Sequence, residues 1–229
     1  MGFVVAIDGP AGAGKSTIAR RVAAALGLAY LDTGAMYRAV AWKALRDGVD
    51  MGSADALERC AASLDLAFRS DEAGGSQRVT VDVEDVTDAI RTPEISQWTS
   101  KVSAMPGVRR IVVAMQRALG ERSEKGVVLE GRDTGSVVFP GADVKIFLTA
   151  SPERRAERRF IELEKLGIEV DYAAVLEDQK ERDARDSGRA DSPLVVAPGA
   201  EVLDTDALTI DQVVDAVLAA CERRTRTER

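Results

Sequence analysis

The stretch GPAGAGKS, residues 9–16, decides the fold of this chain of 229 residues. It matches the pattern GxxxxGK[ST]. A compact apolar run at 3–8 precedes it, and residues 15–26 carry apolar side chains at helical spacing. Glycines between a strand and a helix let backbone amides point at phosphate oxygens, and the helix N-terminus adds positive potential. The sequence therefore predicts a phosphate-binding loop.

This loop also indicates which residues bind a nucleoside triphosphate. Lys15 is expected to reach the outer phosphates, and Ser16 is the expected magnesium ligand. We therefore expect a nucleoside triphosphate, which is ATP if the chain is a kinase, with Mg2+ as the cofactor. The expected ATP-binding residues are Gly9, Pro10, Ala11, Gly12, Ala13, Gly14, Lys15, Ser16 and Thr17.

Apolar segments further along the chain predict the rest of the fold. Short runs that are typical of buried strands occur at 28–31, 127–129, 144–148 and 201–203, and helical patterns separate nearly all of them. An alternation of strands and helices favours a parallel sheet. We predict an α/β fold of P-loop NTPase type over 1–229, a single domain whose parallel five-stranded sheet is flanked by helices.

Two segments depart from this pattern. In residues 63–90, apolar side chains alternate at 64, 66 and 68 and again at 79, 81 and 83, on either side of the turn SDEAGGS. This favours a small antiparallel insert. Residues 153–189 are rich in Arg, Asp and Glu, which is typical of a pair of solvated helices. The core would then comprise 1–62, 91–152 and 190–229.

Composition excludes several classes of protein. The formal net charge of −7 argues against a general nucleic-acid or membrane surface, so any phosphate site must be a local basic pocket. Because the chain has 0 His, it cannot build an imidazole zinc site or a His-based triad. The first residues lack a basic region and a cleavage site of the secretory kind, so we expect a cytoplasmic protein.

Polar motifs follow the second and third predicted strands. DTGAMYR spans 32–38 and EGRD spans 130–133, and ligands of open α/β sheets bind beyond the carboxyl ends of the strands. Arg38 is expected to hold an acceptor phosphate, although an arginine on the surface of an amphipathic helix would give the same pattern. Glu130 is placed as a Walker B carboxylate is, near the phosphate loop.

The phosphate loop alone does not separate kinases from GTPases, ATPases or nucleotide sensors. The guanine-reading motif NKxD is absent, and the chain is short but rich in Arg. A small-molecule kinase fits best. Two alternatives stay open: a P-loop kinase for another small acceptor, and a nucleotide-binding switch or sensor that hydrolyses slowly without an acceptor.

Several consecutive blocks resemble those of bacterial cytidylate kinases, which are nucleoside monophosphate kinases. They are IDGPAGAGKST, LDTGAMYR, IRTPEIS, EGRDTGSVVFPGADVKIFLTAS and KERDARDSGRADSPL, and they run from residue 6 to residue 194. Adenylate kinases typically carry GKGT and DGFPR where this chain has GKST and EGRD. The resemblance implies ATP-dependent phosphorylation of CMP and dCMP, a monophosphate-binding insert at 63–90 and a mobile lid. We expect a monomer with only these small nucleotides as partners.

The resemblance also implies roles for individual residues. Ser100, Arg109 and Asp133 would read cytosine, with Arg110 as the alternative to Arg109. The acceptor phosphate would fall to Arg38, Arg132 and Arg189, and the ribose to Arg182 and Asp186. Thr33 and Tyr37 complete the expected substrate-binding set.

Phosphoryl transfer needs no general base here, because the attacking phosphate oxygen is already ionised. The work is to align donor and acceptor, neutralise charge and exclude water. The expected catalytic residues are Lys15, Arg132, Arg158 and Arg182. In contrast, Arg154, Arg155 and Arg159 are expected to form salt bridges on solvated faces of the lid helices.

Overall fold

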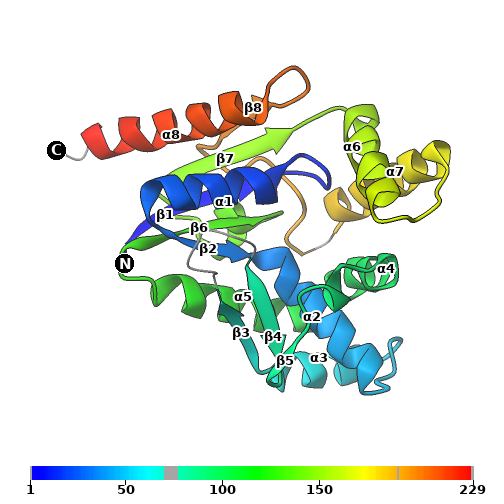
Figure 1. Cartoon of the computed structure of the whole chain (residues 1–229). Coiled ribbons are helices and arrows are strands. Elements are labelled where there is room, and N and C mark those ends of the chain that lie inside the picture. Colours follow the sequence, from blue (N-terminus) through cyan, green and yellow to red (C-terminus); the bar gives the residue numbers. More distant parts are fainter. Residues whose placement is uncertain (1, 70–76, 190, 228–229) are drawn as a thin grey trace.

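The computed structural model describes residues 2–69, 77–189 and 191–227. Its central sheet has the strand order β2-β6-β1-β7-β8, and every pairing between these strands is parallel (Figure 1). The predicted five-stranded parallel sheet is confirmed. The strands are β1 (Phe3–Asp8), β2 (Ala29–Asp32), β6 (Gly126–Gly131), β7 (Val144–Thr149) and β8 (Glu201–Asp204).

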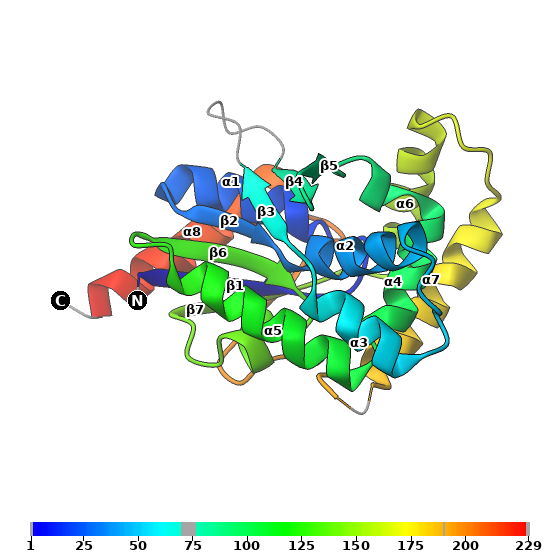
Figure 2. The same cartoon turned by 90° about the horizontal axis from the view of Figure 1, so that it is seen from below.

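Helices cover both faces of this sheet (Figure 2). One face packs against α1 (Lys15–Leu26) and α8 (Ile210–Thr227), and the other against α2 (Thr33–Arg46), α3 (Ala54–Ala62) and α5 (Pro106–Glu121). Side chains alternate along the strands, so the neighbours Val4 and Val5 enter different hydrophobic clusters. The continuous apolar runs of the sequence follow from this burial on both faces.

Local sequence explains where several helices begin. The Asp32 carboxylate accepts a hydrogen bond from the Ala35 amide at 2.8 Å and so caps α2. Three helices, α4 (Pro93–Val102), α5 and α6 (Pro152–Lys165), begin with proline, which lacks the amide hydrogen that a first turn leaves unpaired. These signals fix the helices at the edge of the sheet where its strands end.

The carboxyl ends of the strands meet at one edge of the sheet. In the register of the ladder, Asp8 lies beside Gly131 and Asp32 beside Glu130. The loop after β1 therefore starts next to the loops after β2 and β6. Gly9 allows the turn, because it has φ 149° and a Cβ added there would lie 2.1 Å from the Leu148 carbonyl oxygen.

A small antiparallel sheet lies beside the core, as predicted. It contains β3 (Leu66–Arg69), β4 (Arg78–Val81) and the short β5 (Glu84–Asp85), which the sequence pattern did not indicate. The predicted turn at 70–76 lies outside the described residues. Asp82 ties this sheet to α2 through Lys43 and Arg46. The 3-10 helix η1 (Ala89–Arg91) then leads into α4.

The arginine-rich segment forms the helix pair α6 and α7 (Tyr172–Ser187). This pair has its own small cluster of buried Ala156, Leu163 and Val175. Because α7 ends at Ser187, Arg189 lies beyond the helix. The π-helical turn η2 (Thr134–Val138) completes the elements. None of the helices in the described ranges has both the length and the apolar character that crossing a membrane requires.

Candidate active site

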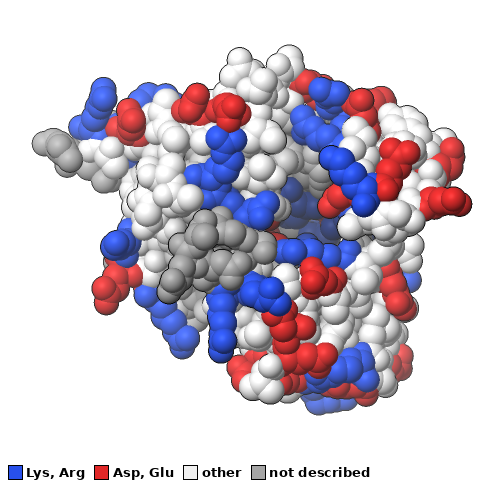
Figure 3. Space-filling view, in the orientation of Figure 1, with Lys and Arg blue, Asp and Glu red and all other residues white. Residues whose placement is uncertain are grey.

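A cavity of about 870 Å³ opens at the carboxyl edge of the sheet. Figure 3 shows Lys and Arg side chains gathered around a hollow on this face, although the protein as a whole is acidic. The predicted residues Gly9 and Pro10 are buried and do not line the cavity. All the others do: Ala11, Gly12, Ala13, Gly14, Lys15, Ser16, Thr17, Thr33, Tyr37, Arg38, Ser100, Arg109, Arg132, Asp133, Arg158, Arg182, Asp186 and Arg189.

Lys15 marks the end of the cavity at the phosphate loop. Its side chain is buried, and Nζ donates a hydrogen bond to the Pro10 carbonyl oxygen at 2.7 Å. Burial, and secondly the positive charge of Arg132, lower the pKa of Lys15 to about 7, although Glu130 acts in the opposite direction. Among the described residues no carboxylate is hydrogen-bonded to this amine, so an anionic ligand would stabilise its charged form.

Glu130 lies next to the phosphate loop, as the sequence predicted. The Ser16 hydroxyl donates to Glu130 Oε1 at 2.5 Å, and the Tyr30 hydroxyl donates to the same oxygen at 3.2 Å. Burial and the nearby Asp32 raise the pKa of Glu130, while Lys15 and Ser16 lower it. In the described ranges no group of three or more His, Cys, Asp or Glu could hold a metal ion. A cation here would need ligands from elsewhere, such as phosphate oxygens.

Arg109 and Asp133 form an ion pair at the opposite end of the cavity. Both side chains are buried, at 2% and 6% exposed, and Arg109 Nη2 donates to Asp133 Oδ2. Nη1 of Arg109 donates to the Ser103 carbonyl oxygen at 2.9 Å. In contrast, Arg110 is exposed and reaches Glu58 at 3.3 Å. Of the two candidate arginines, Arg109 faces the cavity.

Two hydroxyl groups near this pair have no hydrogen-bond partner among the described residues. They are the buried Ser100 Oγ and the Tyr37 hydroxyl. The Arg109 guanidinium lies over the Tyr37 ring at 5.3 Å. Buried polar groups are rarely left unpaired, so these hydroxyls favour a ligand or water at this end.

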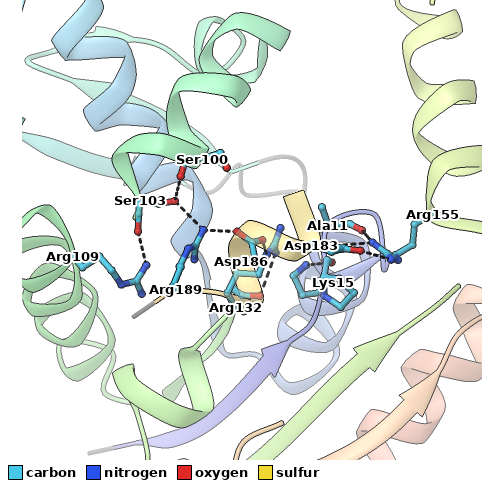
Figure 4. Close-up of polar contacts among 12 residues, drawn as sticks. Ala11, Lys15, Ser100, Ser103, Arg109, Arg132, Arg155, Asp183, Asp186 and Arg189 are labelled. Carbon is cyan, nitrogen blue, oxygen red and sulfur yellow. Dashed lines mark hydrogen bonds and ion pairs between the residues drawn. The ribbon is translucent and has the colours of Figure 1, made fainter. Parts of the chain in front are cut away.

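Between the two ends of the cavity, Asp186 binds two arginines, Arg132 and Arg189 (Figure 4). Arg132 Nε donates to one carboxylate oxygen at 2.8 Å, and Arg189 Nη2 donates to the other. Arg189 also reaches the Ser103 hydroxyl at 3.1 Å. Burial acts to raise the pKa of Asp186, but the two arginines outweigh it and lower this pKa. Both oxygens of the residue expected to bind ribose therefore already accept from arginine.

Arg182 lines the same part of the cavity but makes no hydrogen bond within the described residues. Burial, and then Arg132, lower its pKa to about 10. Arg38 is paired instead, since its Nη2 lies 2.6 Å from Asp32 Oδ2. Arg182 is therefore a cation whose charge has no direct partner in the described protein, and an anion in the cavity would supply one.

Arg158 lies away from this arginine group. It donates to the carbonyl oxygens of Gly12, at 3.3 Å, and Thr205, at 2.8 Å. Its guanidinium therefore lies between the phosphate loop and the segment after β8. Burial and the charge of Arg154 lower its pKa. The geometry associates Arg158 with the donor end of the cavity.

Of Arg154, Arg155 and Arg159, two lie on solvated helix faces as the sequence predicts, and one does not. Arg154 pairs with Glu157 at 2.5 Å and Arg159 with Glu162 at 2.7 Å, as expected for solvated helix faces. The same prediction is wrong for Arg155, whose side chain is 3% exposed. Helix α6 turns this position toward the phosphate loop, where the guanidinium finds buried oxygen atoms.

Some residues of the site carry no signal in the sequence. The Gln77 side chain donates to the Tyr30 carbonyl oxygen at 2.6 Å and lines the cavity from the insert. Ser103 meets Arg189 across 86 residues of chain. Neither belongs to a phosphate-loop pattern, so only their position in the fold identifies them.

Comparisons with known proteins identify the family of this chain. A family model described as Cytidylate kinase matches residues 5–223. The chain is 51% identical to a cytidylate kinase of Solibacter usitatus, over 96% of this chain and 93% of that protein. It is 48% identical to one of Caldanaerobacter subterraneus subsp. tengcongensis, over 98% and 96% of the two chains.

Among solved structures, a shikimate kinase of Bacteroides thetaiotaomicron is similar at 13% identity and a TM-score of 0.49, over 96% of this chain and 98% of that one. So distant a likeness has no bearing on the substrate. The match to the family model leaves out only a few residues at each end, and the relatives align over nearly their whole length. This chain belongs to the cytidylate kinase family.

Proposed function

We propose that this chain transfers the γ-phosphoryl group of ATP to CMP, and also to dCMP. The observation that carries the proposal is the buried Arg109–Asp133 pair at the end of the cavity opposite Lys15. A base bound there would direct its phosphate toward the arginines around Asp186, of which Arg132 lies near Lys15 (Figure 4). Membership of the family supports CMP as the acceptor.

The reaction follows from the charges in the cavity. A phosphate oxygen of CMP attacks the γ-phosphorus of ATP, the new O–P bond forms, and the bond to the β-phosphate oxygen breaks so that ADP leaves. The attacking oxygen is ionised, so no base is needed. Lys15, Arg132 and Arg182 neutralise charge on the transferred group, and Arg38 and Arg189 hold the acceptor phosphate.

The oxygen atoms beside the phosphate loop fit a magnesium ion. The Ser16 hydroxyl would bind it directly, and Glu130 would orient it or its water ligands, since Mg2+ prefers oxygen ligands and keeps several waters. Magnesium bound there would neutralise charge on the donor phosphates. Ala11 to Thr17 would supply amides to these phosphates, and Arg158 would act at the donor end.

Base selection would depend on Asp133. Arg109 occupies Oδ2, which leaves Oδ1 to accept a hydrogen bond from the exocyclic amino group of cytosine. Uracil presents a carbonyl oxygen instead, and two acceptors cannot pair. Arg109 and the Ser100 hydroxyl would donate to the acceptors of the ring. Thr33 and Tyr37 line the approach, while Arg182, with Asp186, would lie near the ribose.

We propose that the protein works as a monomer in the cytoplasm and that its parts move during the reaction. The lid at 153–189 has its own small cluster of buried side chains, which supports movement as a unit. The insert at 63–90 would close over the monophosphate. The core of 1–62, 91–152 and 190–229 would remain fixed.

A coupled assay of ADP release tests the proposal. The purified chain receives ATP and Mg2+ with CMP, dCMP, UMP, AMP or shikimate in turn. We expect the highest kcat/KM with CMP or dCMP and at least about tenfold less with UMP, which is about 1.4 kcal/mol. A preference for another acceptor would contradict the proposal. Hydrolysis of ATP that no acceptor changes would indicate a nucleotide switch.

A further inference from the structure

Arg155 makes more polar contacts than a salt bridge on a helix surface would. Its side chain projects from the first turn of α6 and is 3% exposed. Nε donates to the Ala150 carbonyl oxygen at 3.0 Å, and Nη1 donates to the Ala11 carbonyl oxygen at 3.2 Å. The guanidinium therefore joins the end of β7 to the phosphate loop.

The same guanidinium binds Asp183 with two hydrogen bonds. Nη1 lies 3.0 Å from Oδ1 and Nη2 lies 2.6 Å from Oδ2, which is the bidentate geometry of a strong arginine–carboxylate pair (Figure 4). A pair that is largely removed from water is weakened little by salt and tolerates the loss of one partner poorly. The contact therefore fixes α7 against α6 and the phosphate loop.

Packing reinforces this connection at the phosphate loop. Gly12 has φ 74°, and a Cβ added there would lie 3.0 Å from the Cβ of Arg155. The backbone of the loop and the first turn of α6 are therefore in close contact. A change in the loop when triphosphate binds would act directly on the position of Arg155.

Asp183 lies in α7 between the residues that face the acceptor. Arg182 precedes it, and Asp186, which binds Arg132 and Arg189, lies one helical turn later. Fixing Asp183 fixes the rotation of α7 about its axis and hence the direction of Arg182. Neither Arg155 nor Asp183 lines the cavity, so neither is placed to contact the nucleotides directly.

We propose that Arg155 and Asp183 are positioning residues that couple the donor end of the site to its acceptor end. This inference rests on the proposed function. ATP in the phosphate loop stabilises the arrangement of Arg155, Asp183 and α7 in which Arg182 and Asp186 meet CMP. Because such coupling is reciprocal, each nucleotide strengthens the binding of the other by the same factor.

Calorimetric titration of CMP, with and without a non-hydrolysable ATP analogue, measures this factor. In Arg155→Lys and Asp183→Asn we expect it to fall at least about threefold from the wild-type value, while the Kd for CMP alone changes less than about twofold. The matched controls are Arg185→Lys and Glu181→Gln, an exposed pair 3.6 Å apart on the same helix, and they should behave as wild type.

Two results of the titration would overturn the proposal. One is that the ATP analogue strengthens CMP binding by the same factor in both variants as in wild type, or that it does not strengthen CMP binding even in wild type. The other is an equal loss of CMP affinity with and without the analogue, which a merely structural role predicts. Asp183→Glu, which keeps the charge, provides a folded variant if Asp183→Asn melts, and it should lower the factor because the bidentate geometry is lost.

Hydrogen exchange tests the donor half of the coupling without CMP. The ATP analogue alone should slow amide exchange in 172–187 of the wild type, and Arg155→Lys should remove this protection. If CMP fails to bind but the protection appears, the proposed acceptor is wrong while the connection stands. If CMP is phosphorylated but the analogue leaves exchange in this helix unchanged, the coupling is wrong and the function stands.

Discussion

The two ends of the active site are built in different ways. At the donor end, one continuous stretch of chain, 9–17, supplies the loop and Lys15, whose hydrogen bond goes to a neutral carbonyl group. At the acceptor end, two ion pairs are built from three segments: α5 supplies Arg109, the segment after β6 supplies Arg132 and Asp133, and α7 supplies Asp186. Among the described residues, Lys15 at the donor end has no ion-pair partner, whereas at the acceptor end Arg109, Arg132 and Arg189 pair with buried aspartates and only Arg182 does not.

Because of this difference, we expect substitutions at the two ends to have different effects on catalysis and on the stability of the fold. Removing the charge of Lys15 leaves no buried carboxylate without a hydrogen-bond partner. Removing an arginine that binds Asp133 or Asp186 does leave a buried carboxylate with a lost hydrogen bond. Such an unpaired buried group typically costs about 1–3 kcal/mol. Substitution of Lys15 should therefore reduce catalysis alone, and substitutions that remove a partner of Asp133 or Asp186 should reduce catalysis and stability together.

Lys15→Met should give the largest effect and test the donor end. We expect kcat to fall by about 10²–10³-fold or more, because the charge that balances the donor phosphates is lost. Thermal melting at pH 7 should show no loss of stability, since burial already disfavours the charged amine. Lys165→Met, on an exposed position at the end of α6, is the control. Activity within a few-fold of wild type would refute the donor assignment.

Arg182→Ala and Arg189→Ala sharpen the comparison within the acceptor end. Both should lower kcat/KM for CMP at least about tenfold, or about 1.4 kcal/mol. Arg182 has no hydrogen bond to lose within the described residues, so we expect its removal to lower the free energy of unfolding by less than about 1 kcal/mol. Arg189→Ala should also lower the free energy of unfolding, by about 1–3 kcal/mol, because it leaves Asp186 with one partner fewer.

Denaturant titration beside the kinetics distinguishes the two arginines. Arg185→Ala, at an exposed position of α7, should leave both quantities unchanged. Equal stability of the Arg182 and Arg189 variants would mean that the contact between Arg189 and Asp186 does not stabilise the free protein. Unaltered kinetics in both would remove these residues from the mechanism.

Asp133→Asn should have an intermediate effect. The amide can donate where the carboxylate could only accept, so the ratio of kcat/KM for CMP over UMP should fall by about 5–160-fold, the equivalent of about 1–3 kcal/mol. Arg109 would keep only a neutral partner, and the melting temperature should fall as well. An unchanged ratio would show that Asp133 does not read the base. A lower ratio at unchanged stability would break the contrast between the two ends.

The smallest expected effect is proton uptake when ATP binds. With a pKa of about 7 in the free protein, Lys15 carries only about half a proton at pH 7, and donor phosphates should raise this pKa. Calorimetry in buffers of different ionisation enthalpy should show uptake of up to about half a proton, absent in Lys15→Met. Uptake that survives in this variant would come from another group.

The same pKa predicts how Lys15 affects stability. In the unfolded chain the ordinary value is 10.5, so between about 7 and 10.5 the unfolded state binds more protons than the folded state. The contribution of this residue to the free energy of unfolding therefore rises with pH in that window. At the low end of this window wild type should therefore be less stable than Lys15→Met. The difference in their free energies of unfolding should shrink as the pH rises from about 7 to 10.5.

Local patterns predicted those features that depend on neighbouring residues. The phosphate loop, the buried strands and the alternation in the insert are periodic or continuous in the chain, and the structure confirms the sheet that they imply. Strand β5 went unpredicted because it contains only Glu84 and Asp85, too few residues to show a period. The sequence places Arg155 on a solvated face, because a charge in an arginine-rich helix gives no indication of the buried oxygen atoms that it contacts in the fold.

The sequence by itself determined the class of fold, the phosphate loop and the polar motifs at the strand ends, because each of these is a run of adjacent residues. Only the tertiary structure decided how the charges are paired. Arg109 meets Asp133 across 24 residues, Arg155 meets Asp183 across 28, and Arg132 meets Asp186 across 54. These pairs form because a parallel sheet brings distant strand ends to one edge and the lid helices pack over it, and no spacing in the chain encodes that proximity.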